Sequence, residues 1–300
     1  MSDTGSAEEL LLAATAATRR GELVAAESQA SAAHERFRAA GNLDGRMRAL
    51  NLLGVIRFER GAPAEAEGAF AEALELARQL RDTLMAARAS NNLASVFHLQ
   101  GQPHLALGLY RQVLLDYQRL GDRRGTAETW HNIGIVHRQL RDWDEADAAT
   151  AESLRHADLA GDRGMLGIAM AGKAELDLDR GDLALAMQEL ERADELARET
   201  GDEVGAAQVA MLRAVAQLKG GDFGRALATA GSARALIKEL GVPLLEAEAT
   251  GVAARAARAM GDDAEAERNR TQAIELFTRL GAAGFIQRFE ADYGGAELRS

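Results

Sequence analysis

The chain has 300 residues, more than one hydrophobic core usually supports, so it forms either several domains or a modular array. Hydrophobic residues make up 47% but aromatic residues only 4%, and only three prolines interrupt the chain, a composition that excludes a sheet-rich fold and favours helices. A net charge of −11 argues against nonspecific binding to nucleic acid or to an anionic membrane, and the absence of cysteine excludes disulfides and thiolate chemistry.

The N-terminal segment has none of the features of a signal peptide. Met1 to Glu9 is polar and acidic, and we expect residues 1–6 to be disordered. The apolar stretch Leu10 to Ala17 is too short to span a bilayer. We therefore expect a cytoplasmic protein with no membrane partner and no nucleic-acid partner.

Glycine recurs along the rest of the chain at a fixed spacing, and we call these recurring positions marks. Each mark ends one helix in the left-handed conformation that glycine adopts without strain, and the Asp that often follows caps the next helix. The first series of marks is Gly21, Gly61, Gly101, Arg141, Gly181, Gly221 and Gly261. The second series is Gly41, Arg81, Gly121, Gly161, Gly201, Gly241 and Gly281. The spacing of 40 residues predicts seven pairs of helices, A and B.

Small residues occupy matching places in every pair, which predicts where helices A and B cross closely. Helix A carries Ala14, Gly54, Ala94, Gly134, Ala174, Ala214 and Ala254 seven residues before the first-series mark. Helix B carries Ala26, Ala66, Ala106, Ala146, Ala186, Ala226 and Ala266 five residues after it. A third column, mostly small, is Ala33, Ala73, Val113, Ser153, Ala193, Ala233 and Ala273. The chain is thus predicted to be an all-α array.

Asn132-Ile133-Gly134 followed by Arg141-Asp142-Trp143-Asp144-Glu145-Ala146 resembles a tetratricopeptide repeat. The 40-residue spacing is similar to that of kinesin-light-chain-like and LGN-like arrays and of bacterial regulator proteins. The resemblance implies a right-handed α-solenoid in which helix A lines the concave groove. We expect the array over residues 7–281, with repeats at about 7–41, 42–81, 82–121, 122–161, 162–201, 202–241 and 242–281. A C-terminal capping helix is expected at 282–293, followed by a tail at 294–300.

If helix A lines the groove, its exposed positions lie 13, 10, 9, 6, 3 and 2 residues before each first-series mark. In repeats two to four these positions are rich in Asn, Arg and His. Asn amides both donate and accept, which suits a peptide backbone, and Arg suits carboxylates. The candidate partner-binding residues are Arg48, Asn51, Arg88, Asn91, Asn92, His98, His131, Asn132, Ile135 and Arg138. The resemblance implies that Asn92 and Asn132 hold ligand backbone.

The favoured function is a non-enzymatic scaffold that binds another protein or a peptide, with acidic groups as a fitting partner chemistry. The alternative is a regulatory sensor that changes its superhelical pitch when a peptide binds. The same Asn and His residues could instead be solvated, or could link neighbouring repeats. No catalytic motif or metal-ligand spacing is present, so we expect no cofactor and no metal.

Two helix-A residues depart from the apolar pattern of the earlier repeats. Lys173 and Arg213 stand where the earlier repeats have Leu53, Leu93 and Ile133. Either the register shifts there or these faces meet something polar, and association through the terminal repeats is a further alternative.

Overall fold

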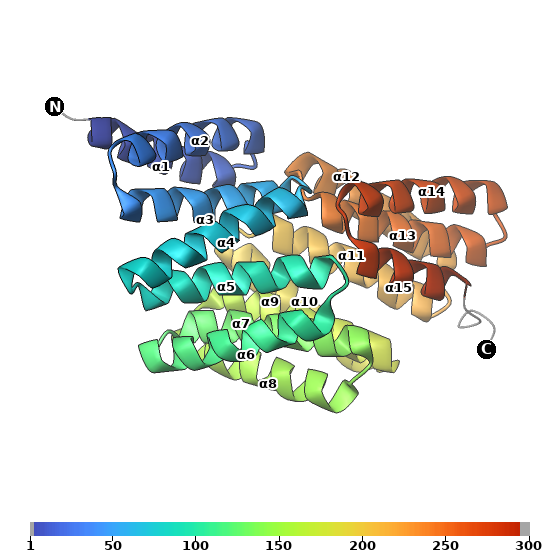
Figure 1. Ribbon diagram of the computed structural model, residues 1–300. Helices are drawn as coiled ribbons and strands as arrows, with labels where there is room; N and C mark the ends of the chain where they lie inside the picture. Colours follow the sequence, from blue (N-terminus) through green and yellow to red (C-terminus); the bar gives the residue numbers. More distant parts are fainter. Residues whose placement is uncertain (1–2, 295–300) are drawn as a thin grey trace. The chain divides into compact units, whose positions relative to one another are not determined.

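The computed structural model describes residues 3–294, which form fifteen helices (Figure 1). The expected disordered segment 1–6 and tail 294–300 lie partly outside this range, and the first helix begins at Asp3 rather than at residue 7. The chain forms two compact units, the first ending at Gly121 and the second beginning at Asp122.

The first unit contains three pairs of helices that stack in chain order. They are α1 (Asp3–Arg19), α2 (Leu23–Ala39), α3 (Leu43–Glu59), α4 (Pro63–Leu80), α5 (Thr83–Leu99) and α6 (Pro103–Leu120).

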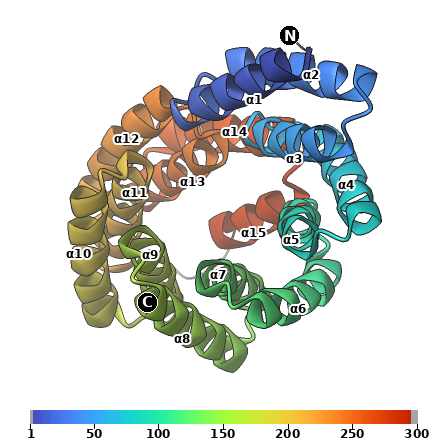
Figure 2. The same cartoon turned by 90° about the vertical axis from the view of Figure 1, so that its left-hand side faces the viewer.

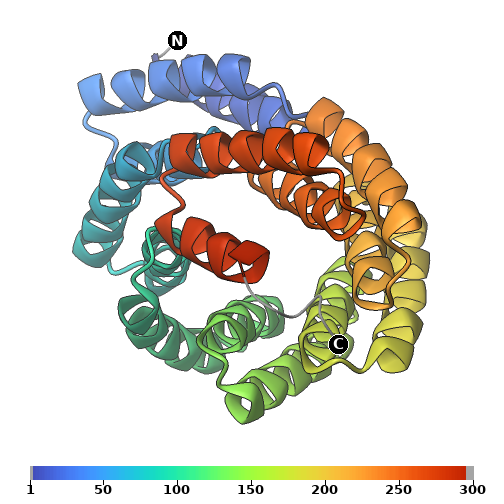
Figure 3. The same ribbon diagram turned by 90° about the vertical axis from the view of Figure 1, so that its right-hand side faces the viewer.

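The second unit contains four further pairs and a final single helix. They are α7 (Arg123–Leu140), α8 (Trp143–Ala160), α9 (Arg163–Arg180), α10 (Leu183–Thr200), α11 (Glu203–Lys219), α12 (Phe223–Leu240), α13 (Pro243–Ala259), α14 (Asp263–Arg279) and α15 (Ala283–Gly294). Figure 2 shows α7, α9, α11 and α13 on the inner side of this unit's curve and α8, α10 and α12 on its outer side. In Figure 3, α15 lies inside that curve, and it packs against α13 and α14.

The turns between helices confirm the prediction made from the glycine marks. Twelve of the marks are glycines with positive φ, and the other two are Arg81 at φ 58° and Arg141 at φ 62°. A residue with a side chain is disfavoured in this left-handed region, so both arginines are held there by the surrounding helices.

The capping chemistry at the helix starts agrees with the sequence at most positions. The carboxylates of six N-cap aspartates accept a hydrogen bond from the backbone N–H three residues later, for example Asp82 from Met85 at 3.0 Å. The exceptions are Asp182 and Asp142, whose side chains make no such bond. The Asp142 carboxylate lies 3.2 Å from Nδ1 of His137 instead.

The small columns form the contact between the two helices of each pair. The helix-A alanines of this contact are fully buried: Ala14, Ala94, Ala174, Ala214 and Ala254. The same holds for six alanines of the helix-B column: Ala26, Ala66, Ala106, Ala146, Ala186 and Ala226. At Gly54, an added Cβ would lie 2.4 Å from the ring of the buried Phe70. The columns therefore set how closely the two helices approach.

The register does not shift at the two charged helix-A positions, because Ala174 and Ala214 next to them stay buried. Nζ of Lys173 lies 2.7 Å from the buried Asp177 and 3.3 Å from Asp147 of α8. The Arg213 guanidinium donates to Asp194 of α10 at 3.1 Å. Of the two alternatives left open by the sequence, the polar contact is the one observed.

Candidate functional site: the inner face of the helix pairs

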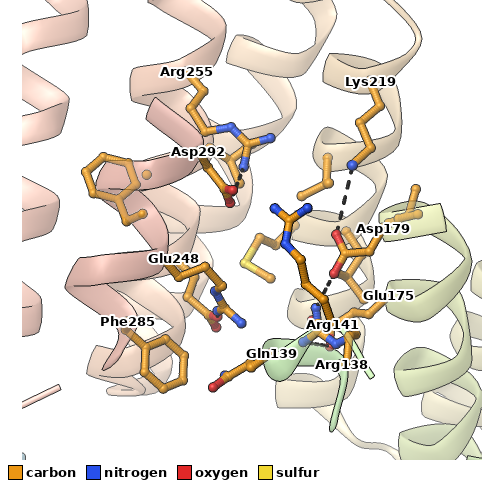
Figure 4. Close-up of a pocket in the computed structure, with 18 of the residues that line it drawn as sticks. Arg138, Gln139, Arg141, Glu175, Asp179, Lys219, Glu248, Arg255, Phe285 and Asp292 are labelled. Atoms are coloured by element: carbon orange, nitrogen blue, oxygen red, sulfur yellow. Dashed lines mark hydrogen bonds and ion pairs between the residues drawn. The ribbon is translucent and has the colours of Figure 1, made fainter. Parts of the chain in front are cut away.

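A cavity of about 170 Å³ opens on the inner side of the second unit, between the helices of repeats four to seven and α15. Its walls carry both apolar and charged side chains. The apolar and aromatic ones are Trp143, Leu178, Met211, Leu212, Val215, Val252, Phe277, Phe285 and Phe289. The charged ones are Arg138, Arg141, Glu175, Asp179, Lys219, Glu248, Arg255, Arg288 and Asp292 (Figure 4).

The periodicity of an α-helix explains why these residues share one face. In helix A, the inner positions lie 10, 9, 6, 3 and 2 residues before the first-series mark. They recur every three or four residues, so they lie on one face of the helix. The small residue seven before the mark faces helix B, which leaves this stripe on the opposite, inner side. Glu175, Leu178 and Asp179 of α9 and Met211, Leu212, Val215 and Lys219 of α11 line the cavity from these positions. Within the second unit, some of the predicted inner-column residues therefore line the cavity.

Arg138 links two neighbouring repeats at the edge of this cavity. Its guanidinium donates to the Asp179 and Glu175 carboxylates, each at 2.8 Å, and only 12% of its side chain is exposed. Burial disfavours the cation, but the two carboxylates outweigh it and raise the pKa of Arg138 above its ordinary value. Burial likewise works to raise the pKa of Asp179, yet Arg138 holds that pKa below its usual range. Arg138 and Asp179 therefore both stay charged at neutral pH.

Two ion pairs join α15 to α13 across the cavity. Arg288 donates to the Glu248 carboxylate at 3.2 Å, and Arg255 lies 3.6 Å from Asp292. Burial raises the pKa of Glu248 to about 7; Arg288 opposes this rise, whereas the nearby Glu175 adds to it. Glu248 is thus close to half-protonated at neutral pH. It is the titratable group of this site whose charge changes near physiological pH.

The candidate residues of repeats two and three lie in the first unit and are largely engaged with one another. Arg48 forms ion pairs with Glu8 of α1 and, at 2.9 Å, with Asp44. The Asn92 amide donates to the Asn51 carbonyl oxygen at 3.3 Å, which joins α5 to α3. For these residues the structure shows the contact between neighbouring repeats that the sequence left as an alternative.

The other candidates of the third repeat differ in exposure. Asn91 is buried, with 3% of its surface accessible, and His98 is half-buried. Arg88 is exposed, with only a 4.0 Å contact from its guanidinium to the Met85 sulfur. Arg88 is therefore the candidate with the most accessible cationic group.

The candidates of repeat four lie in the second unit. His131 packs against Gly172 of α9, where an added Cβ would lie 2.9 Å from the imidazole ring. Burial, followed by the charge of Arg138, lowers the pKa of His131 to about 4, so the ring is neutral at physiological pH. Asn132 and Ile135 are half-buried.

Several residues of the cavity were not singled out from the sequence. Glu248 and Arg255 occupy inner-column positions of repeat seven, so continuing the count of columns to the last repeat would have found them. Arg288 and Asp292 belong to α15, and no repeat pattern places that helix. The charged groups that line the cavity thus come from all four repeats of the second unit and from α15.

The described part of the chain has neither a metal-binding cluster nor a membrane-spanning helix. Residues 3–294 hold no group of three or more His, Asp and Glu side chains arranged to bind a metal ion. Within the same range, no helix is long and apolar enough to cross a bilayer.

Comparisons with known proteins agree with this architecture. The tetratricopeptide repeat family matches residues 85–158. A Rap protein complexed with competence and sporulation factor is similar at 12% identity with a TM-score of 0.81, covering 93% of this chain and 77% of that one. The Rap conjugation regulator of plasmid pLS20, in complex with the Phr* peptide, is similar at 17% identity with a TM-score of 0.74, covering 96% and 76%.

A tetratricopeptide repeat protein from Parabacteroides merdae is also similar, at 19% identity with a TM-score of 0.51, covering 94% of this chain and 99% of that one. No curated protein matches the sequence. The matched segment spans α5 to α8, and the remaining helix pairs repeat the same turns and small columns. The chain therefore has the fold of a tetratricopeptide-repeat array, and its residues 85–158 match that repeat family.

Proposed function

We propose that this protein is a non-enzymatic interaction scaffold that holds a segment of a partner protein or peptide on the inner columns of repeats two to four. The observation that carries the proposal is that α15 packs against α13, where Arg288 and Asp292 of α15 pair with the inner-column residues Glu248 and Arg255. The inner column of one repeat therefore forms a surface on which a helical segment packs. The structurally similar Rap proteins were solved with a bound factor and with a bound peptide, which supports a peptide ligand here.

The chemistry of repeats two to four suits a peptide with acidic groups. Arg88 is exposed and has no ion-pair partner among residues 3–294, so a ligand carboxylate gains a contact there without breaking another ion pair. The Asn92 to Asn51 bond, at 3.3 Å, is longer than the usual hydrogen bond between such groups. A ligand peptide group can replace it at a small net cost, since both amides then find new partners.

A pull-down from the source cells tests this proposal with a triple variant of the inner columns, Arg88→Ala/Asn92→Ala/Asn132→Ala. The matched control replaces three exposed outer residues whose side chains have no polar partner within residues 3–294, Glu75→Ala/Arg111→Ala/Asp144→Ala. We expect the wild type and the control to recover the same partner, and the inner-column variant to recover at most a tenth of it. Unchanged recovery by the inner-column variant would sink the proposal, provided that its circular dichroism and melting temperature match those of the control.

A further inference from the structure

The charged residues around the cavity of the second unit do not balance one another. Five cations, Arg138, Arg141, Lys219, Arg255 and Arg288, face four carboxylates, Glu175, Asp179, Glu248 and Asp292. With Glu248 ionised, this set has an excess of one positive charge, in a chain whose net charge is −11. A closed set of ion pairs would leave no such excess.

The excess charge lies on Arg141. Four of the cations have carboxylate partners within 4.0 Å, but Arg141 has no ion-pair partner within residues 3–294. Figure 4 shows its side chain extending into the cavity between the Arg255–Asp292 pair and Asp179. Its guanidinium therefore presents its donors to the cavity rather than to a neighbouring acid.

A second donor in the same wall lacks an acceptor. Nη1 of Arg288 is buried and has no hydrogen-bond partner in the described part of the chain. The carboxylate that Arg288 does contact is Glu248, whose pKa of about 7 leaves it only partly charged. A buried donor without an acceptor is costly, so an incoming acceptor is favoured there.

The position of Arg141 in the chain adds to this argument. At the six other turns between helix A and helix B the residue is glycine, and all of these residues share the left-handed conformation. A side chain there costs about 1 kcal/mol relative to glycine. Strain alone does not identify a site, because Arg81 of the first unit has the same conformation and is not among the residues that line this cavity. What distinguishes Arg141 is the cavity in front of it.

We propose that the cavity between repeats four to seven and α15 binds a monocarboxylate with an apolar body, with Arg141 as its counter-charge. One negative charge neutralises the excess positive charge of the cavity lining. A phosphate dianion would bring a second negative charge beside Glu175, Asp179 and Asp292. Leu178, Met211 and Phe285 offer contacts to the apolar body. The carboxylate can belong to the C-terminal residue of a peptide or to a free small acid. The inference does not depend on where the partner segment of the proposed scaffold binds.

The experiment titrates the full-length protein with four probes, read by the fluorescence of Trp143 in the cavity wall and by equilibrium dialysis. N-acetyl-leucine stands for a peptide C-terminus, hexanoate for a free acid, N-acetyl-leucine amide for the uncharged analogue, and inorganic phosphate for the dianion. We expect at least one of the two acids to bind, and the amide and phosphate to bind at least tenfold more weakly than that acid. The tighter of the two acids identifies the source of the carboxylate.

Arg141→Gly is the decisive variant, because it removes the cation and installs the residue that the turn favours. We expect it to melt no lower than the wild type and to bind the acid at least tenfold more weakly. Arg81→Gly is the matched control; it relieves the same backbone strain and should leave binding unchanged. Equal binding by Arg141→Gly and wild type, equal binding of acid and amide, or no binding of either acid would overturn the assignment. None of these outcomes affects the pull-down test of repeats two to four.

Discussion

Glu248 is predicted to make the second unit less stable as the pH rises, and Glu248→Gln should remove that dependence. The Glu248 side chain is half-buried between α13 and α15, with 24% of it exposed. Arg288 contacts it at 3.2 Å, and Glu175 and Arg138 act on it from α9 and α7. Its pKa rises from 4.5 to about 7 because the burial penalty of the anion exceeds the attraction of Arg288.

The sign follows from proton binding. Between pH 4.5 and pH 7 the folded state holds this proton more tightly than the unfolded state, so the free energy of unfolding falls as the pH rises through this window. A shift of this size corresponds to about 3 kcal/mol at pH 8 and to about 1 kcal/mol at pH 5. Gln keeps the shape and an amide donor but does not ionise. The stability of Glu248→Gln relative to wild type should therefore rise by about 2 kcal/mol between pH 5 and pH 8.

Thermal melts of the two proteins at half-unit pH steps from 5 to 8.5 measure this difference. For a unit of this size, about 2 kcal/mol corresponds to roughly 4–8 °C in melting temperature. Glu239→Gln, at an exposed position of α12, is the control, and its melting temperature should match that of the wild type at every pH. A melting-temperature difference between Glu248→Gln and wild type that stays constant with pH would refute the reasoning, because it would mean that Glu248 titrates alike in the folded and unfolded chains.

Two further predictions concern packing and the Arg138 network. Gly54→Ala should lower the free energy of unfolding by about 1–2 kcal/mol in a denaturant melt, because the added methyl group meets the buried Phe70 ring. Gly68→Ala, on the open surface of α4, should raise the free energy of unfolding by up to about 1 kcal/mol. Equal effects of the two substitutions would contradict the close crossing of helices A and B. Arg138→Met should cost about 2–4 kcal/mol, because it leaves Glu175 without its ion-pair partner and Asp179 with only Lys219 at 3.9 Å. A loss below about 0.5 kcal/mol would show that the network contributes little.

Much of the fold could be predicted because its determinants are local. A residue with positive φ ends one helix at each of the fourteen turns of the described chain, and Asp follows it at eight of them. These residues gave the turn positions. Helical periodicity and the buried small residues also predict one inward-facing stripe on helix A, and several of its residues in α9 and α11 line the cavity. Both arguments need only residues within one repeat.

The charged cavity could not be predicted in the same way. Arg138 pairs with Glu175 and Asp179 one repeat later, and that pairing depends on how neighbouring helices stack. Glu248 becomes buried because α15 returns into the curve of its own unit, which no repeat pattern specifies. The sequence placed the polar surface in repeats two to four, whereas the described second unit adds a set of charges from repeats four to seven.

The central claim is that the inner columns of repeats two to four hold the partner, and site-specific crosslinking in the source cells tests it most directly. The chain contains no cysteine, so a single cysteine carries a photo-crosslinker to one chosen place. Arg88→Cys places it on an inner column of α5, and Glu75→Cys places it on exposed surface of α4. We expect one partner band from Arg88→Cys that is absent from Glu75→Cys. A partner that crosslinks equally from both positions, or only from Glu75→Cys, would contradict the account.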